Sequence, residues 1–528
     1  MLSQVYSSAI FGVDAYLMEI EVNYRQSPRS DTVIVGLPDA AVKESKDRVL
    51  TALANSGFVP VHGVTTINLA PADIKKEGPS FDLPIALGLL TSTGQLRSNS
   101  FGDYIIVGEL ALNGAVRRVN GVLPVAMCAR KSGKRGVLVP VENAPEASVV
   151  EGVEVHGVKD LVQAVRFIEG DDRPEPVRTE LSELFADSRS YPIDLHDVKG
   201  QAHVKRALEV AVAGGHNILM IGPPGAGKSM LAKCVPTILP EMTLEEALET
   251  TKIHSIVGLL TSDNYLIATR PFRSPHHTIS NAGLIGGGSF PRPGEVSLAH
   301  NGVLFLDELP EFRRDALEVL REPLEEGSIT ISRVLGSLTF PASFMLAAAM
   351  NPCPCGYFTD PTHECRCNPR QIQHYINKIS GPLLDRIDIH VDVPALKYRE
   401  IAADGAGEHS AEVQRRANAA RRFQRERFGG RRPYSNAGMT SRHLKKFCRP
   451  DEQAQQLLKT GMNELGISAR AYDRILKVAR TIADIEAVGG DAGVAADGSN
   501  ADPNDPTLRA HHISEAIQYR TLDRKLWL

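Results

Sequence analysis

A glycine-rich segment between an apolar run and a helical pattern constrains this chain more than any other feature. The apolar run NILMIG is typical of a buried strand, and MLAKCV after the segment continues as a helix. In a strand–loop–helix of this spacing, backbone N–H groups close around phosphate and the helix N-terminus adds partial positive charge. We therefore predict a nucleotide-binding α/β domain around these residues. The segment consists of Gly222, Pro223, Pro224, Gly225, Ala226, Gly227, Lys228 and Ser229.

A second motif supplies the carboxylates that such a loop needs. The run GVLFLDE is an apolar strand that ends in Asp307 and Glu308. Lys228 would neutralise the β and γ phosphates of ATP, while Ser229 and Asp307 would hold Mg²⁺. Glu308 is then left to polarise the attacking water. Alone, the acidic pair is also compatible with a capped strand end, but together with the upstream loop it favours ATP hydrolysis.

The pattern along the 528 residues predicts several domains, because one hydrophobic core rarely serves so long a chain. Residues 1–168 alternate strand-like runs such as YIIVGELAL and GVLVPV with helical ones, and residues 169–192 resemble a linker. Residues 193–397 repeat the alternation, whereas residues 398–528 are helical and rich in Arg. The acidic low-complexity stretch 489–506 is expected to be a mobile loop. The predicted fold class is α/β with a helical C-terminal part.

Composition narrows the location and the class of partner. The formal net charge of −4 says nothing of partners, so a nucleic-acid surface would have to be local. The first residues lack a basic start and an apolar block, and no apolar run nears the roughly 18 residues that span a bilayer. Four of the seven cysteines lie within residues 353–367, which suits a local site in a reducing compartment. We expect a cytoplasmic protein without a membrane partner.

Four blocks resemble a known family: GPPGAGKS, LFLDELPEF, AAAMNPCPCG and GPLLDRIDIHVDVP. They are similar to the magnesium-chelatase-like branch of the AAA+ ATPases. The whole chain, N-terminal part included, resembles the ComM/YifB family of bacterial competence proteins. The resemblance implies an AAA+ core followed by a helical lid, and a homo-oligomeric ring that we expect to be a hexamer.

The resemblance also implies roles for polar residues outside the two motifs. Asn351, which closes the run MLAAAMN, matches the sensor-1 group beside the γ-phosphate. Arg386 in LLDRID matches the arginine finger that reaches a neighbouring subunit's site. Arg470 in SARAYDRIL matches sensor 2, with Arg474 as its rival. An arginine supplied by a neighbour makes hydrolysis depend on assembly, because it stabilises transition-state charge in trans. Ordinary surface ion pairing is the alternative for these arginines.

A segment near the N-terminus resembles the part of Lon proteases that bears their nucleophilic serine. It reads from Lys76 through Ser80, and GELALNGAVRRVNGVLPVAMCARKSG continues the resemblance. A serine nucleophile needs a base, which in that family is a lysine. Alignment without gaps puts Leu123 at the position of the lysine, and Arg117 and Arg118 stay protonated and cannot replace it. We therefore expect a protease fold without proteolysis, with Ser80 as a turn residue or helix cap and a domain used for assembly or DNA contact.

Two close cysteine pairs follow Asn351 in the chain. They are Cys353, Cys355, Cys365 and Cys367. Two short pairs separated by a loop can surround one tetrahedral Zn²⁺, which would order the loop after sensor 1. The C-x-C spacing is less usual than C-x-x-C, so free thiols and a redox pair stay open as alternatives, and His363 is a replacement ligand.

Three basic features are candidates for contact with DNA. Residues 329–341 alternate apolar and polar side chains around Arg333, which predicts a hairpin similar to the pre-sensor-1 hairpin of replicative helicases in the same branch. Arg270 and Arg273 begin an insert whose basic and flexible residues suit phosphate contact. Residues 411–450 hold twelve Arg and Lys against two Glu, a local charge of +10. The alternatives are a packed hairpin, a loop that contacts the next subunit and a solvated helix face.

These features favour a ring-shaped, ATP-dependent motor that moves single-stranded or branched DNA. In the family that the chain resembles, the role is branch migration during recombination of incoming strands in natural transformation. A metal-chelatase motor subunit that remodels a protein partner is the alternative, and the Lon-like segment argues against it, because we do not expect such subunits to carry one. A scaffold whose ATP state sets assembly is a third hypothesis. Stimulation of ATP hydrolysis by DNA separates the three.

Overall fold

The strand–helix alternations predicted from the sequence fall into two units of the structure. A computed structural model describes residues 2–73, 75–97, 100–181, 184–185, 191–288, 291–333, 336–358, 360, 363–396, 407–430, 433–465, 468–488, 502 and 505–520. The first unit comprises Met1–Ser188, Leu244–Ala268 and Gly336–Phe340, and the second the rest of the chain. The second and third of these segments lie within the range that the sequence division assigned to the ATPase core. The predicted boundary at residue 398, parts of the 169–192 linker and most of the 489–506 loop lie outside the described residues.

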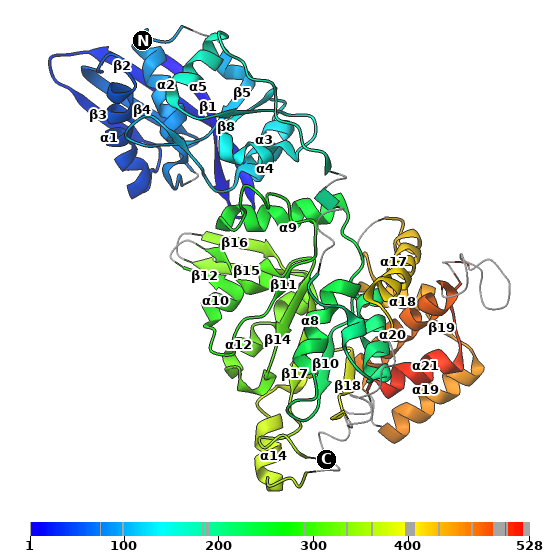
Figure 1. Cartoon of the computed structure of the whole chain (residues 1–528). Coiled ribbons are helices and arrows are strands. Elements are labelled where there is room, and N and C mark those ends of the chain that lie inside the picture. Colours follow the sequence, from blue (N-terminus) through cyan, green and yellow to red (C-terminus); the bar gives the residue numbers. More distant parts are fainter. Residues whose placement is uncertain are drawn as a thin grey trace. The chain divides into compact units, whose positions relative to one another are not determined.

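The first unit contains a four-stranded and a three-stranded sheet, besides the short pair β6 (Glu109–Leu110) and β7 (Val116–Arg117) (Figure 1). A mixed sheet has the order β1 (Leu2–Phe11), β2 (Asp14–Gln26), β4 (Gly63–Ala70) and β3 (Asp31–Val35). A parallel sheet has the order β5 (Tyr104–Ile106), β8 (Gly136–Pro140) and β9 (Glu154–Val158). The helices of this unit include α1 (Ala40–Asn55), α2 (Asp82–Ser92), α3 (Val122–Lys131), α4 (Ala144–Ser148), α5 (Leu161–Glu169) and α9 (Leu244–Val257). The strands expected in YIIVGELAL and GVLVPV are thus confirmed.

The second unit contains a five-stranded parallel sheet (Figure 1). Its order is β11 (Phe272–Arg273), β14 (Val303–Leu306), β17 (Met345–Met350), β10 (Ile218–Ile221) and β18 (Ile389–Asp392). Every residue of β10, β14 and β17 is buried, because strands inside a parallel sheet are covered on both faces. Ile221 pairs with Met350, and Leu306 pairs with Ala348. The residues that follow these strands therefore meet at one carboxyl edge, where ligands bind in such sheets.

Helices complete the second unit, as the sequence predicts for its C-terminal part. They include α7 (Ala202–Gly214), α8 (Lys228–Ile238), α17 (Ser410–Arg427), α18 (Ser441–Phe447), α19 (Glu452–Leu465), α20 (Ala469–Val488) and α21 (Ala510–Gln518). Residues of α17, α20 and α21 share one hydrophobic core with β10 and α7.

The predicted hairpin is confirmed, since β15 (Ser328–Arg333) and β16 (Gly336–Pro341) form a two-stranded sheet. Among the described helices, none has the length and apolarity that crossing a membrane requires.

Candidate functional site

The glycine-rich loop lies at the carboxyl edge of the parallel sheet, between β10 and α8. Gly225 and Gly227 have φ values of 77° and 86°, which side chains with a Cβ rarely adopt. A Cβ at either position would meet no described atom within 4 Å, so the backbone conformation and not crowding requires glycine there. Gly227 is the N-cap of α8, which brings the positive end of that helix to the loop.

Lys228 and Asn351 meet beside this loop, as the sequence predicts for the phosphate lysine and sensor 1. The Lys228 Nζ donates hydrogen bonds to the carbonyls of Gly222 and Pro223 at 2.8 and 2.9 Å and to Asn351 Oδ1 at 3.1 Å. Burial lowers the pKa of Lys228, and the two carboxylates of the second motif oppose that shift. The ammonium is thus held where it can neutralise the phosphates of a nucleotide on the loop.

Ser229 and Asp307 come together from two separate elements. The Ser229 Oγ donates to Asp307 Oδ2 at 2.6 Å, which pairs a hydroxyl with a carboxylate. Hard oxygen donors of this kind suit Mg²⁺ bound together with nucleotide phosphates, so the residues present fit the metal that the motif implies. The loop, Lys228 and this oxygen pair thus lie together and offer groups of the kinds that a nucleotide and its Mg²⁺ require.

Glu308 adjoins the oxygen pair in a strained backbone conformation. Its φ of 52° lies in the left-handed region, which costs a residue with a Cβ about 1–2 kcal/mol. The Glu308 N–H donates to Asp307 Oδ1 at 2.9 Å, and the Glu308 side chain remains 57% exposed. Backbone strain of this kind concentrates at functional sites. The carboxylate is therefore accessible to the water that it would activate.

Sequence reasoning missed the contact between Glu308 and His277. The His277 Nδ1 lies 3.5 Å from Glu308 Oε2, and the pair becomes an ion pair when the imidazole is protonated. In the sequence, His277 stands out only as part of the basic insert that begins at Arg270. Its place near Glu308 follows from β11, a strand whose carboxyl end lies at the same sheet edge as that of β14. This strand has only two residues, too few for a hydrophobic pattern to reveal it.

The arginines assigned to the finger and to sensor 2 group around two other carboxylates. Arg386 is 6% exposed, donates to the Pro382 carbonyl at 2.5 Å and forms an ion pair with Glu325. Arg474 forms an ion pair with the buried Asp388. Burial alone would raise the pKa of Asp388, but the charge of Arg474 helps to hold it below its usual range.

Arg470 differs from its rival in having an exposed side chain near the start of α20. Its charge helps to lower the pKa of Glu325, after the larger effect of the hydrogen bond from Arg386. Arg474, in contrast, also donates to the carbonyl of Arg386 at 3.2 Å. Of the two candidates for sensor 2, Arg470 is therefore the one at the surface.

Arg270 and Arg273 are engaged within the fold. The Arg270 guanidinium donates to the carbonyls of Pro240 at 2.6 Å and Asn301 at 2.7 Å. Arg273 forms a bidentate pair with Glu295, with distances of 2.6 and 2.7 Å. Neither residue can contact a phosphate with these groups unless it first releases such partners. Arg333, by contrast, is exposed at the end of β15, and its Nη1 donates to the carbonyl of the preceding residue at 3.0 Å.

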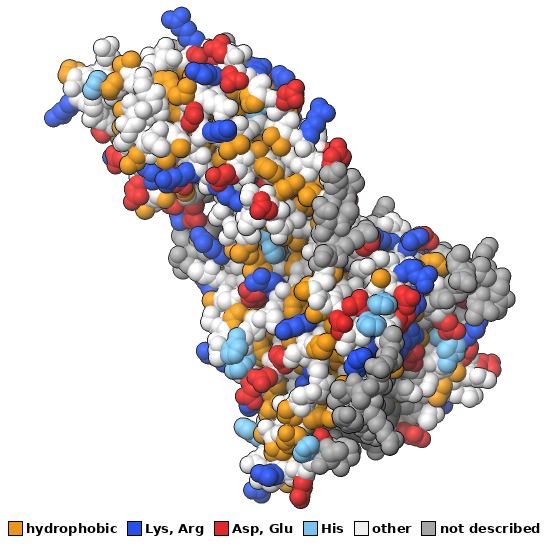
Figure 2. All heavy atoms as spheres, viewed as in Figure 1, with side chains coloured by type: hydrophobic (Ala, Val, Ile, Leu, Met, Phe, Trp, Pro, Cys, Tyr) orange, Lys and Arg blue, Asp and Glu red, His pale blue; other side chains and the backbone are white. Residues whose placement is uncertain are grey.

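The basic segment 411–450 divides into structural and surface arginines. Arg416 pairs with Glu209, and Arg427 pairs with Asp484 where both side chains are fully buried. The positive count in the sequence therefore overstates the charge at the surface. Lys and Arg side chains do lie over α17 in Figure 2, among carboxylates. Arg431 and Arg432 lie outside the described residues.

Four arginines of α17 line a groove of about 510 Å³. The groove is also lined by amide side chains of the same helix and by residues 240–242, which include the carboxylate of Glu241. Its basic and amide groups are the types that contact a nucleic-acid backbone. Arg421 is engaged within the fold, since it donates to the carbonyls of Val212 at 2.9 Å and Ala213 at 3.2 Å. The other arginines of the groove are Arg415, Arg422 and Arg425.

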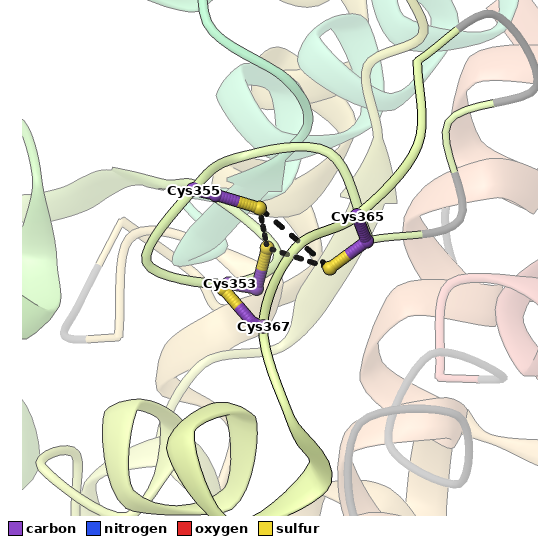
Figure 3. A group of neighbouring side chains, drawn as sticks. All are labelled: Cys353, Cys355, Cys365 and Cys367. Carbon is purple, nitrogen blue, oxygen red and sulfur yellow. Dashed lines mark hydrogen bonds between the residues drawn. The ribbon is translucent and has the colours of Figure 1, made fainter.

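The four cysteines after Asn351 converge in space (Figure 3). Their ligand atoms all lie within 4.8 Å of one another, so the cluster could hold a metal ion. The Cys353 Sγ is 3.3 Å from that of Cys355 and 3.7 Å from that of Cys365. His363, the replacement ligand considered from the sequence, lies with its Nδ1 3.7 Å from Asp360 Oδ1.

The Ser80 segment has a different environment. Ser80 lies in a 3-10 turn, Pro79–Phe81, whose N-cap is Gly78, while Phe81 is the N-cap of α2. It is thus a turn residue, and the helix-cap alternative is wrong. Leu123, at the position of the expected lysine, is fully buried, and its N–H donates to the buried carboxylate of Glu146 at 2.9 Å.

Three family models match this chain. Residues 194–401 match the model of magnesium chelatase, subunit ChlI, and residues 407–490 match that of its C-terminal part. Residues 20–143 match a model described as subunit ChlI of Mg-chelatase. Because of this last match, the N-terminal part does not distinguish this chain from a chelatase subunit, contrary to the expectation from the sequence.

Relatives match either nearly the whole chain or a part of it. Competence protein ComM of Haemophilus influenzae is 44% identical over 529 residues, which covers 99% of this chain and 98% of that protein. YifB of Escherichia coli is 43% identical over 530 residues, with the same coverage. Lon protease 2 of Bacillus subtilis is 27% identical over 174 residues, 30% of this chain and 31% of that protein. Identity over the full length, together with the assembled phosphate loop, shows that the chain belongs to the ComM/YifB family of magnesium-chelatase-like AAA+ ATPases.

Proposed function

We propose that this protein hydrolyses ATP to move single-stranded or branched DNA through a homo-oligomeric ring, during recombination of incoming DNA in natural transformation. The observation that carries the ATPase part is the convergence of Lys228, Ser229, Asp307 and Asn351 at one sheet edge. The DNA part is supported by the arginine groove of α17 and by the name of the relative ComM, a competence protein.

Each residue of the ATP site has a part that follows from its position. Lys228 neutralises the β and γ phosphates, and Asn351, already bonded to Lys228, contacts the γ-phosphate. Ser229 and Asp307 hold Mg²⁺, which when bound withdraws charge from the phosphate oxygens. Glu308 orients the attacking water and accepts its proton.

We assign Arg386 to a role across a subunit interface of the ring, for which we propose six subunits. Its partner Glu325 is 52% exposed, so the ion pair reaches the surface on that side. The neighbour's phosphates would compete with Glu325 for the guanidinium, which would then stabilise the charge of the transition state.

Arg386→Ala should leave ATP binding nearly intact but reduce hydrolysis. Mixing it with Lys228→Ala protein should restore some activity. No recovery in proven mixed rings would contradict action in trans.

DNA stimulation of ATP hydrolysis is the experiment that decides the function. Single-stranded or branched DNA should raise the ATPase rate, and strand displacement should require hydrolysable ATP. Affinity for DNA should fall steeply with salt, because each neutralised phosphate releases counterions. An assembled protein whose ATPase ignores every DNA form would instead favour a chelatase-type motor, which the family model of the N-terminal part also supports.

Two charge reversals test the groove directly. Arg415→Glu together with Arg422→Glu should weaken DNA binding and flatten its salt dependence. Lys459→Glu, on the exposed face of α19, is the control for a single charge reversal, to be compared with each groove substitution made alone, and should change little. Arg333→Ala should preserve assembly and basal hydrolysis but lose DNA movement. Equal DNA affinity in the groove variant and in the control would remove the groove from the proposal.

We also propose that the four clustered cysteines hold Zn²⁺. Thiolates are preferred zinc ligands, and four of them form a closed structural site. Such a site persists where thiols stay reduced, which fits a cytoplasmic location. Protein purified without chelator should contain about one zinc per chain. Metal-free protein with four freely titrating thiols would contradict this assignment.

A further inference from the structure

The cysteine cluster lies within a loop that closes on the ATP site. The chain leaves β17 at Asn351, passes through the cysteines and enters α14 (Pro369–Ile376). The Asn368 side chain accepts the N–H of Gln371, so the helix begins directly after Cys367. Burial raises the pKa of Tyr375, and the nearby backbone of Asn351 opposes that shift. The loop thus begins at the residue that contacts Lys228 and returns close to it.

The sulfur positions suit a single tetrahedral ion. A Zn–S length of about 2.3 Å places the sulfurs of a tetrahedron about 3.8 Å apart, whereas a disulfide requires about 2.05 Å. The Sγ of Cys365 lies 3.7 Å from that of Cys353 and 3.6 Å from that of Cys355. Figure 3 shows the sulfurs of Cys353, Cys355 and Cys365 in mutual contact, with Cys367 beside them.

The same loop touches the phosphate loop at Gly356. Gly356 has a φ of 88°, and a Cβ there would lie 2.5 Å from Cδ of Pro224. The Gly356 N–H donates to the carbonyl of Cys353 at 3.0 Å, which closes the turn of the first cysteine pair. No methyl group fits between the two loops. A shift of the cysteine turn towards the phosphate loop would therefore displace Pro224.

We propose that one Zn²⁺ held by these four thiolates positions both Asn351 and Pro224, so that metal occupancy controls ATP hydrolysis although the ion contacts no nucleotide. This inference rests on the proposed ATPase activity and zinc site. A metal that binds the folded form adds its binding free energy to the order of the loop that carries its ligands. Small displacements of Asn351 lower the rate steeply, because catalysis depends on precise placement at the γ-phosphate.

Metal content and coordination are measured first. Protein purified without chelator is analysed for metals, stripped with a mercurial reagent and a chelator, and reloaded with Co²⁺ alone. A tetrahedral tetrathiolate site should then show intense visible bands and a sulfur-to-cobalt charge-transfer band. No stoichiometric zinc and no such spectrum would overturn the zinc site and with it the inference, while leaving the ATPase proposal intact.

Substitutions at Cys365 then test control of hydrolysis. Cys365→Ser should lose the metal and lower kcat at least tenfold, with KM for ATP changed less than about threefold. Cys365→His, which supplies another zinc ligand, should recover both metal and kcat. The matched control is Cys128→Ser, because Cys128 is a buried thiol of the first unit. It should keep zinc and full activity. Folded, metal-free protein with normal kcat would overturn the inference while leaving the zinc site standing.

Gly356→Ala tests the contact without removing a ligand. The added methyl should displace Pro224, and the φ of 88° strains any residue with a Cβ at this position. Both effects should move the two loops apart and lower kcat severalfold, while zinc stays at about one per chain. This variant remains informative if metal-free protein fails to fold, because its metal is retained. Normal kcat in Gly356→Ala with zinc bound would overturn the proposed coupling between the two loops.

Discussion

The phosphate loop and the Ser80 segment are two glycine-containing motifs that lead into helices, yet only one gathers partners for chemistry. Lys228 is bonded to Asn351, a residue more than a hundred positions away in the chain, and Ser229 is bonded to Asp307. Ser80 contributes its carbonyl to the N–H of Gly108 at 2.9 Å, a backbone contact that any residue could make. A short motif therefore indicates a reaction only where the fold brings catalytic side chains from distant strands next to it.

The acidic residues beside the two motifs differ in the same way. Asp82 is fully buried and forms a bidentate pair with Arg48 at 2.9 and 3.1 Å. Burial of this kind makes a carboxylate structural, because its charge is already satisfied. Asp307 is only partly buried and faces the hydroxyl of Ser229. One carboxylate holds a fold together, and the other faces the hydroxyl with which it would share Mg²⁺ in the proposed site.

Removal of the Lys228 ammonium should have the largest effect. Lys228→Ala is expected to abolish ATP binding and to lower hydrolysis by about 10³-fold or more, since phosphate charge is then uncompensated. Binding of a fluorescent ATP analogue and release of phosphate measure the two effects. Lys233→Ala, an exposed lysine on the same helix, is the control and should behave as wild type. ATP binding that survives in Lys228→Ala would contradict the assignment of the phosphate loop.

Glu308→Gln should separate binding from turnover. The amide cannot accept a proton from water, so hydrolysis should fall about 10²-fold or more while ATP still binds. Single-turnover hydrolysis and equilibrium binding, measured on the same preparation, distinguish the two steps. Normal hydrolysis in this variant would remove Glu308 from the mechanism and direct attention to another base.

A lysine at position 123 should damage the fold and not create a protease. Leu123 is 0% exposed, and a buried lysine whose pKa is depressed by about three units costs about 4 kcal/mol at pH 7. Thermal unfolding of Leu123→Lys should occur well below that of wild type. Leu123→Met, which conserves volume, should cost less than about 1.5 kcal/mol. A stable Leu123→Lys protein that cleaves unfolded substrates would show that only the base is missing.

Ser80→Ala should have the smallest effect. A partly exposed turn residue contributes within about 0.5 kcal/mol to stability, and neither ATPase rate nor DNA stimulation should change. Incubation with an unfolded protein substrate, with and without ATP, should yield no fragments from wild type or variant. Serine-dependent cleavage stimulated by ATP would show that the Ser80 segment is also catalytic, and would contradict the difference drawn between the two motifs.

The core of the ATP site could be predicted because its signals are local. The spacing from Gly222 to Ser229 and the strand that ends at Asp307 are encoded in short segments, and parallel strands place their carboxyl ends at one edge. The hairpin at 329–341 was likewise predictable from alternation, and the structure confirms it. His277 was not, because its strand is too short for a pattern to register.

The arginines show where prediction from sequence stops. Arg270 and Arg273 lie in a segment whose composition suits DNA, yet backbone carbonyls and Glu295 engage their guanidinium groups. Arg427 adds to the local charge of the basic segment, yet it pairs with Asp484 out of contact with solvent. An arginine has five donors and accepts a carboxylate from any segment that folds against it, so its role depends on contacts between distant parts of the chain.

The sequence by itself determined the phosphate loop, the three strands β10, β14 and β17 of the parallel sheet, the family and the absence of a lysine at position 123. Backbone conformation and hydrophobic pattern act over a few residues, so short motifs carry them. Only the tertiary structure decided that four sulfurs from two cysteine pairs meet at one point, that Gly356 presses on Pro224 and that Arg386 pairs with Glu325. Such contacts join residues far apart in the chain, and their distances are set by how whole elements pack.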